Sequence, residues 1–566
     1  MNMVNIDFYK KPVLLLLSLF LSLFLSPVNA HNGEDEYEND PFGAQLNTMH
    51  RSSSQRSDES GWLSPSYDDQ DAAIQTMDNA GIKSSLNFRL ETLGSLGTGD
   101  YAPFWFTSDR QGLSAYDNGS GYLRSAALGE MKFPSQFGVG YGIDLGLAAG
   151  MQSDFFIHQL YVDLSYKWMG LSIGSREIWG ELKNENLSTG GLTWSGNSRP
   201  VPQIRLALPE YTRLSILGGW FSVKGHVAYG IYTDNKWRGR NPDSAFTDRL
   251  LYHSKAAFLR FGDVKRSPFH ATVGLEMYSQ FGGVMHNRKL MSNEDVLEEY
   301  RLPSNPRAYW DILLPFNEAG EQTKENGNSL GSWHLSFDYL GENFGLRAYY
   351  EHFYEDHSGM LGIEYKSDMN GEKDYVFYGF RRNWFDGLYG IELNLPENLP
   401  VRDVVLEVLN TRGQCGPVYR NPHATVAEGI DGRDGFYTHE LYDSYSHWGY
   451  AIGNPVLVSP VYNADDDQRF KSNRLLMFHA GLDGGIGPHF DYRVMITSSR
   501  HWGTYEDPYN SVARLTSYLV EGTWLPSGTY GWRVKLSLGL DSGKGTPLGD
   551  GNKGVMLSIS RLWKIL

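Results

Sequence analysis

The chain has 566 residues, a formal net charge of -16 and one cysteine, Cys415. An acidic balance argues against nucleic acid as a partner, because phosphate backbones attract proteins with basic faces. A single cysteine leaves no internal disulfide framework, and a mean hydropathy of -0.41 excludes a bundle of membrane-spanning helices.

Residues 1–30 have the pattern of a secretory signal peptide. Lys10 and Lys11 precede an apolar run at 13–25, and the small residue Ala30 closes the segment. The run is shorter than the ~20 residues that a membrane-spanning helix needs, so we predict export and cleavage after Ala30. The residue directly after the cleavage site is His31 and not cysteine, so a lipid-anchored lipoprotein is not indicated.

The segment 31–83 is polar and acidic, and its composition predicts a tail or linker with a short helix near 68–80. The rest of the chain, 84–566, is rich in short stretches that alternate in polarity, beginning with SLNFRLETLG at 85–94. The sequence therefore divides into a signal peptide, an acidic segment and one large all-β domain.

Apolar side chains recur at every second position in these stretches, with charged or polar side chains between them. A strand points successive side chains to opposite faces, so each stretch has one apolar and one polar face. In WRVKLSLGL, Leu536 and Leu538 share the apolar face, and Lys535 lies on the other. Further examples are QLYVDLSYKW (159–168), FSVKGHVAYGI (221–231) and WHLSFDY (333–339).

An exported chain with amphipathic strands and no disulfides is typical of a transmembrane antiparallel β-barrel. Lipid offers no hydrogen bonds, so a sheet crosses it only as a closed barrel whose backbone groups are all paired. We expect about 18 strands, from a count of about 16 to 20, because bacterial barrels have even numbers. The C-terminal LSISRLWKIL is predicted to close on the first strand. The competing interpretation is a soluble sandwich or propeller, but no blade repeat is present.

Three connections between the predicted strands are long, at 177–203, 282–330 and 413–471, and the second contains a helical pattern, NEDVLEEYRL. Loops of this length are uncommon unless they are functional or disordered. Barrels of this class carry long loops outside the cell and short turns in the periplasm. The side on which each loop lies depends on the strand count, which the sequence leaves open.

Three segments resemble the Wzi family of capsule-assembly proteins, outer-membrane barrels that act as lectins for capsular polysaccharide. They are DYAPFWFTSDRQGL (100–113), SGNSRPVPQIRLALPEY (195–211) and HWGYAIGNPVL (447–457), in the order and spacing of the family. The resemblance covers most of 84–566. It implies a barrel of about 18 strands in the outer membrane of a Gram-negative bacterium, with a small helical part on the periplasmic side. It also implies that capsule sugar is held at the cell surface, but it assigns no ligand-contacting residues.

A polysaccharide site needs flat aromatic faces for sugar rings and planar donors for hydroxyl and carboxylate groups. Three stretches combine tryptophan with arginine. The candidate binding residues are Trp237, Arg238 and Arg240 in TDNKWRGR, Arg381, Arg382 and Trp384 in YGFRRNWF, and Arg199 and Arg205 shortly after Trp194. The alternative for each cluster is an interfacial belt that meets lipid phosphates. The expected partners are capsular or extracellular polysaccharide and outer-membrane lipid, with the chain a monomer.

Two other functions stay open on the sequence. A barrel of about 16–18 strands can enclose an aqueous channel, so a porin is the first alternative. A lumen-active barrel hydrolase is the second, built on His334 and Ser336. A lipid-cleaving site would need the apolar face, whereas this pair shares the polar face of Asp338, so we expect no enzyme activity.

No cofactor or metal is expected. The sequence has no HExxH, paired CxxC or Walker motif. The acidic turns at 431–435 and 463–468 offer carboxylates to calcium, but solvated loop charge is the preferred interpretation.

Overall fold

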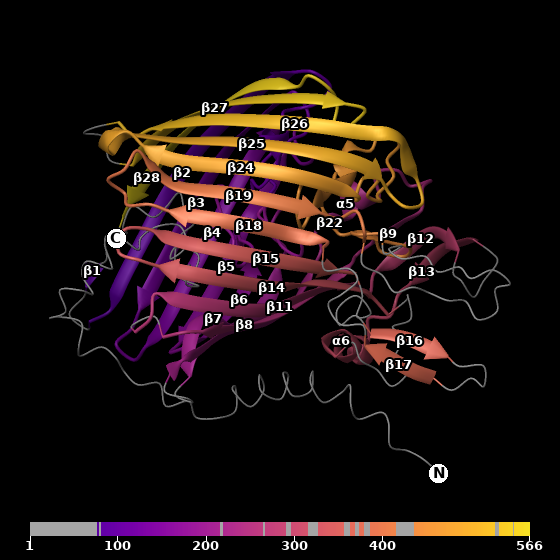
Figure 1. Cartoon of the computed structure of the whole chain (residues 1–566), viewed down its shortest axis with the longest axis horizontal. Helices are drawn as coiled ribbons and strands as arrows, with labels where there is room; N and C mark the ends of the chain where they lie inside the picture. Colours follow the sequence, from indigo (N-terminus) through magenta and orange to yellow (C-terminus); the bar gives the residue numbers. More distant parts are fainter. Residues whose placement is uncertain are drawn as a thin grey trace, which may run out of the picture.

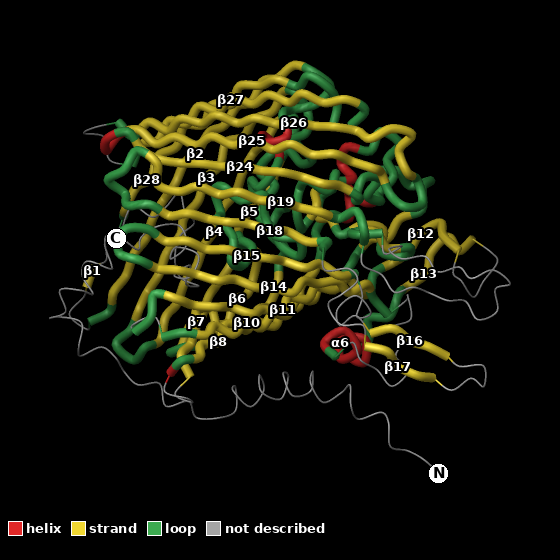
Figure 2. Tube along the Cα trace, in the orientation of Figure 1, coloured by secondary structure: helices red, strands yellow, loops and turns green. Residues whose placement is uncertain are grey.

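The structure is a computed structural model that describes residues 76–77, 81–214, 219–263, 266–289, 296–314, 326–355, 363–367, 373–377, 385–414, 435–526, 531–546 and 548–565. The predicted signal peptide, and the acidic segment before Thr76, lie outside these residues. Figures 1 and 2 show one barrel of long strands, with the bulk of its connections gathered at one end.

Eighteen antiparallel strands close the barrel, as the sequence predicted. Each strand pairs with its neighbours along the chain, and the last pairs with the first, so that Phe88 lies opposite Trp563. The strands are β2 (Lys83–Thr98), β3 (Gly119–Lys132), β4 (Phe137–Ala149), β5 (Phe155–Tyr166), β6 (Met169–Ser175), β7 (Gln203–Leu214), β8 (Phe221–Ile231), β10 (Leu251–Phe261), β11 (Phe269–Phe281), β14 (Asn328–Leu340), β15 (Gly345–Tyr354), β18 (Gly387–Asn394), β19 (Val401–Asn410), β24 (Leu475–Gly485), β25 (Phe490–Gly503), β26 (Pro508–Trp524), β27 (Trp532–Lys544) and β28 (Lys553–Lys564).

The alternation in the sequence maps onto the two faces of the wall. In β27 the side chain of Leu538 is 49% exposed on the outside, whereas that of Ser537 is 1% exposed on the inside. In β14 Phe337 faces outward, and His334 and Ser336 are buried inside, as predicted. An apolar outer band on a sheet without free edges is the fold of an outer-membrane β-barrel.

The long connections all lie at one end of the barrel. Strands alternate in direction, so every second connection meets at the same end, and these connections are 99–118, 150–154, 176–202, 232–250, 282–327, 355–386, 411–474, 504–507 and 545–552. The opposite end carries short turns, such as Lys167–Trp168, and the end of β28. By the rule for such barrels, the long-loop end faces the cell exterior. The three long loops predicted from the sequence are present within a few residues of their expected bounds.

The long connections also contain the short elements. They are α4 (Phe104–Thr107), α5 (Asn235–Arg238), α6 (Pro306–Leu313), the small sheet of β9 (Phe246–Asp248), β12 (Val284–Lys289) and β13 (Val296–Arg301), the hairpin of β16 (Ile363–Ser367) and β17 (Lys373–Phe377), the strand pairs β20 (Thr438–His439) with β21 (Asp443–Ser444) and β22 (Ser446–His447) with β23 (Tyr450–Ala451), and the turn η4 (Pro460–Tyr462). Another turn, η5 (Gly487–His489), lies at the short-turn end.

No helix in the described part of the chain is both long and apolar enough to cross a membrane. The three described α-helices belong to long-loop connections, so the periplasmic helical part implied by the family resemblance is not among the described residues.

Two predicted helical patterns proved wrong where the structure describes them. Thr76–Met77, within the segment 68–80, form the short strand β1, which pairs with β2. Residues 296–301 of NEDVLEEYRL form β13, which pairs with β12. Six residues carry too weak a local preference to decide between helix and strand, and pairing with a neighbouring strand overrides it.

The outward position of Leu538 gives a test of the lipid-facing band. Leu538→Arg places a charge near the middle of a spanning strand, and we expect it to lower the free energy of unfolding by ~2–4 kcal/mol. Denaturant titration in lipid vesicles measures the effect, and Leu538→Met serves as the control that should unfold like the wild type. Unchanged stability of the arginine variant would show that this face does not contact lipid.

Candidate functional site

Three of the long connections fold back into the barrel and fill its lumen, as Figure 2 shows for the loops seen through the wall. We call residues 99–118, 176–202 and 435–474 together the plug. Most plug side chains are buried, including Trp105, Leu192 and Tyr445. The plug forms one hydrophobic cluster with inward-facing residues of the wall.

Carboxylates on the inner wall hold the second plug segment. Glu351 of β15 accepts hydrogen bonds from the backbone N–H groups of Leu192 (2.8 Å) and Thr193 (3.1 Å). The Lys183 ammonium lies 2.8 Å from the same carboxylate. Glu351 is fully buried, so its charge is balanced by these plug groups and not by water.

Glu407 of β19 makes a second anchor. It accepts hydrogen bonds from the backbone N–H and the hydroxyl of Thr189, both at 2.8 Å, and from the Ser188 hydroxyl at 2.5 Å. The first plug segment is held in the same manner, because the Phe104 N–H donates to Asp541 of β27 at 2.9 Å. Removing one partner of a buried ion pair, such as Lys183 with Glu351, costs ~3–5 kcal/mol.

The three plug segments bind one another through their backbones. The N–H of Gly112 donates to the carbonyl of Asn197 (3.1 Å), and the N–H of Ser195 donates to that of Ile452 (3.0 Å). The Asn197 amide donates to the Ala451 carbonyl at 2.9 Å. These residues belong to the three segments that resemble the Wzi family. Segments hundreds of residues apart therefore meet at one place in the lumen.

Gly112 shows how closely these segments approach. Its φ is +68°, and a Cβ placed there would lie 2.5 Å from the Arg199 side chain and 2.6 Å from its backbone nitrogen. Glycine adopts this conformation at no steric cost, and its lack of a Cβ leaves the space that Arg199 occupies.

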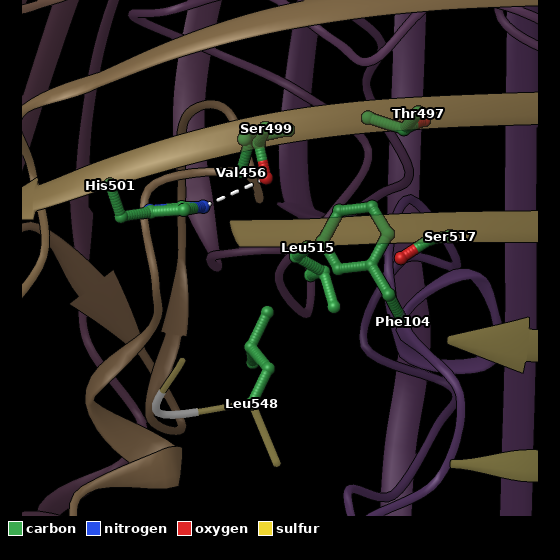
Figure 3. Close-up of a pocket in the computed structure, with 8 residues that line it drawn as sticks. All are labelled: Phe104, Val456, Thr497, Ser499, His501, Leu515, Ser517 and Leu548. Atoms are coloured by element: carbon green, nitrogen blue, oxygen red, sulfur yellow. Dashed lines mark hydrogen bonds between the residues drawn. The ribbon is translucent and has the colours of Figure 1, made fainter. Parts of the chain in front are cut away.

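A cavity between the plug and strands β25 and β26 is a packing gap and not a sugar site. It has about 210 Å³ of empty volume, but no part of it accommodates a water molecule. Figure 3 shows His501 hydrogen-bonded to Ser499 beside it, at 2.8 Å. Its lining is formed by Phe104, Val456, Thr497, Ser499, His501, Leu515, Ser517 and Leu548.

At the long-loop end the plug and the connection 232–250 present aromatic rings and arginines together. Arg199 contacts two rings, with its guanidinium carbon 4.7 Å from the centre of Trp448 and 5.4 Å from that of Phe156. The Trp448 ring is partly exposed, and its Nε1 donates to the exposed Thr233 hydroxyl at 3.3 Å.

Arg199 has no carboxylate partner among the described residues. Its side chain is 6% exposed, and its Nη2 has no hydrogen-bond partner there. Burial lowers the pKa of Arg199 to about 10, so the guanidinium is charged at neutral pH. Its interactions with the two rings are cation–π contacts, which strengthen when desolvated.

Arg240 and Trp237 form a second stacked pair on the same surface. The Arg240 guanidinium carbon lies 4.0 Å above the Trp237 ring. Its Nε donates to Asp466 at 3.0 Å, so the residue is both stacked and ion-paired. The Trp237 ring lies against Gly449, where a Cβ would come within 2.5 Å of the ring.

Arg238, the third candidate in this stretch, has a different position. It is fully buried, and its Nε lies 3.0 and 3.1 Å from the two carboxylate oxygens of Asp234. Its Nη2 donates to the Ser446 carbonyl at 2.9 Å, and Asp234 accepts the Trp448 N–H at 3.1 Å. Arg238 thus joins the connection 232–250 to the plug and offers no free surface to a ligand.

The remaining candidates lie elsewhere. Arg205 faces the lumen from β7, away from the outer surface, and its Nη2 lies 2.9 Å from His226 Nδ1. Arg381, Arg382 and Trp384 lie outside the described residues.

Sequence reasoning did not single out a group of tyrosines beside these arginines. Tyr101 lies 5.2 Å from Tyr462 and 6.0 Å from Tyr116, and Tyr116 lies 6.0 Å from Tyr462, measured between ring centres. Gln152 donates to the Tyr450 hydroxyl at 3.0 Å. Their only signal in the sequence was membership of, or nearness to, the Wzi-like segments, because the rings are far apart in the sequence: Tyr101 and Tyr116 come from the connection 99–118 and Tyr462 from 411–474.

We call Arg199, Trp237, Arg240, Trp448 and Tyr116 the aromatic–arginine face. Trp448, Arg240 and Tyr116 are partly exposed, whereas Arg199 and Trp237 are 6% and 8% exposed and contact Trp448 and Arg240. Partly exposed rings stack on the apolar faces of sugars, and guanidinium groups bind carboxylates or hydroxyls. His334 and Ser336 offer no comparable chemistry. Ser336 donates to Asp338 at 2.9 Å, and the described contacts include no hydrogen bond between Ser336 and His334.

Searches with protein-family models and against curated protein sequences found no match. Solved structures of outer-membrane barrels are similar in fold. Wzi, an outer-membrane protein involved in group 1 capsule assembly in Escherichia coli and a carbohydrate-binding β-barrel, matches with 13% identity and a TM-score of 0.49, over 84% of this chain and 83% of Wzi. OprD of Pseudomonas aeruginosa matches with 10% identity and a TM-score of 0.42, over 88% and 100% of the two chains. These likenesses concern the barrel fold and do not distinguish between functions.

The wall carboxylates give a test of the closed lumen. In planar bilayers we expect the wild type to carry little steady current and Glu351→Ala/Glu407→Ala to carry more, because the plug loses its anchors. Glu342→Ala/Glu397→Ala, at exposed sites in the short turns, is the matched control. Heat-dependent gel mobility checks that each barrel is folded. A large wild-type current, like that of a general porin, would contradict a closed lumen.

Proposed function

We propose that this barrel binds and anchors capsular or extracellular polysaccharide at the surface of a Gram-negative cell during capsule assembly, and that it catalyses no reaction. One observation carries the proposal: the three Wzi-like segments meet in the lumen, and two of them contribute Arg199 and Trp448 to the aromatic–arginine face at the outer end. Trp237, Arg240 and Tyr116 of other segments complete that face. Wzi-like segments that lie hundreds of residues apart in the sequence thus come together in the structure.

The blocked lumen supports retention over transport. The plug is bonded to several strands around the wall, including β15, β19 and β27. A polymer that meets this end remains outside, where stacked rings and guanidinium groups are available. A long chain presents many identical repeats to one site, so weak contacts still retain it by avidity.

The electrostatics favour a polymer that bears acidic groups. The chain as a whole is acidic, and its wall carboxylates are occupied by the plug. Arg199, at the long-loop end, is a buried cation without a carboxylate partner among the described residues. A uronate or another acidic substituent supplies the missing anion, and each charge-assisted hydrogen bond to it contributes ~1.5–3 kcal/mol.

Substitution of the two stacked arginines tests the proposal. Arg199→Gln and Arg240→Gln should each weaken polymer binding by about ten-fold or more. In cells, the double variant should move polymer from the pellet to the medium while total polymer stays constant. Arg266→Gln, at an exposed site in a short turn, is the control and should retain polymer normally.

The other outcomes separate the alternatives. A fall in total polymer would assign the protein to synthesis or export. Normal retention after deletion of the whole protein would refute the lectin proposal and favour a porin. Normal retention in the double variant, with loss on deletion, would move the binding site away from the aromatic–arginine face.

A further inference from the structure

Helix α6 lies on the outside of the barrel, against the lipid-facing side of the wall. Its residues Ala308 and Ile312 are buried against Phe281 of β11. Phe281 points away from the lumen, because its neighbour Gln280 points inward and donates to the plug carbonyl of Ser444. Figure 1 shows α6 outside the barrel at the long-loop end.

Two polar contacts fasten this helix to the wall. The Tyr229 hydroxyl of β8 donates to the carbonyl of Tyr309 at 2.9 Å. The Lys255 ammonium of β10 donates to the carbonyls of Ile312 and Leu313 at 2.9 and 2.7 Å. Lys255 alternates with the inward-facing Ser254 and so occupies a lipid-facing position. The helix C-terminus, with its unpaired carbonyls and negative dipole end, covers that charge.

Helix α6 is stabilised by its own capping residues as well as by its contacts with the wall. The Asn305 side chain caps its N-terminus by accepting from the Ala308 N–H at 3.1 Å, and Pro306 follows at the first turn. Proline and asparagine at these positions favour helix initiation.

The face of α6 opposite the wall is open and mostly apolar, with the exposed Arg307 at its edge, 3.8 Å from Asp311. Trp310 is 63% exposed, and Tyr309 and Leu314 are exposed as well. Ala308 and Ile312 are spaced by four residues on the docked side, and Trp310 and Leu314 are spaced by four on the other. A helix in water would carry polar residues on its free face.

The lipid-facing band of the barrel continues to the level of this helix. Ile204 of β7 and Ile231 of β8 lie at the long-loop ends of their strands, point outward and are more than half exposed. We propose that α6 is an interfacial helix, which inserts Trp310 and Leu314 into the boundary between headgroups and acyl chains of the outer leaflet. Tryptophan is enriched at this depth because its ring is amphipathic.

Spin labels measure the environment of this face directly. In a Cys415→Ser background, Trp310→Cys and, separately, Leu314→Cys are labelled with a nitroxide and reconstituted into phosphatidylcholine vesicles. Collisions with oxygen, which partitions into acyl chains, are compared with collisions with a water-soluble nickel chelate. Leu538→Cys in the outward band and Thr233→Cys in an exposed connection provide the lipid and water references.

The expected result is a ratio of oxygen to nickel collisions at both α6 positions that shifts from the value at 233 toward the value at 538. Dominant collisions with nickel would place the face in water and overturn the proposal. Low collisions with both reagents would mean that a protein surface, such as a second copy of this chain, covers the face, which also overturns it. Each variant replaces only one of Trp310 and Leu314. Agreement between the two labelled positions therefore shows that the result does not depend on which of these side chains was replaced.

Discussion

Buried carboxylates on the inner wall are the contacts on which the closed lumen depends. A loop that folds into a barrel carries backbone N–H groups out of water, and each one needs an acceptor. Glu351 and Glu407 supply acceptors that are charged, and charge-assisted hydrogen bonds are roughly twice as strong as neutral ones. The plug in turn supplies the donors without which these glutamates would be uncompensated charges. Wall and plug therefore stabilise each other.

The aromatic–arginine face follows from that arrangement. Most arginines described in the lumen are matched to acids, as Arg238 is to Asp234 and Arg347 is to Asp338. Arg199 instead makes cation–π contacts with Trp448 and Phe156, and its backbone carbonyl accepts a hydrogen bond from His447 at 2.8 Å. The plug backbone thus holds the residue in place while its charge is left without a carboxylate, a state suited to an anionic ligand.

Polar groups on the outer surface of the wall need hydrogen-bond partners within the protein, because lipid supplies none. Most outward positions carry apolar side chains. Lys255 and His253 are outward-facing exceptions, and both have backbone carbonyls as partners, from α6 and from Ala228. A connection that begins outside the membrane therefore completes the barrel surface where the strand sequence departs from the apolar pattern.

The sequence by itself predicted the barrel, the inward face of His334 and the long loops, because strand alternation is a local pattern with a period of two residues. It gave the strand number only as about 18, within a range of about 16 to 20, and the structure fixed it at eighteen. The sequence did not determine the short elements in the loops, such as β13, whose pairing partner lies in another segment. Nor did it separate Arg238 from Arg199, which lie in similar stretches of sequence. Only the tertiary structure decided that Asp234 neutralises Arg238 and that Arg199 contacts two aromatic rings, because burial and charge pairing depend on which distant segments meet.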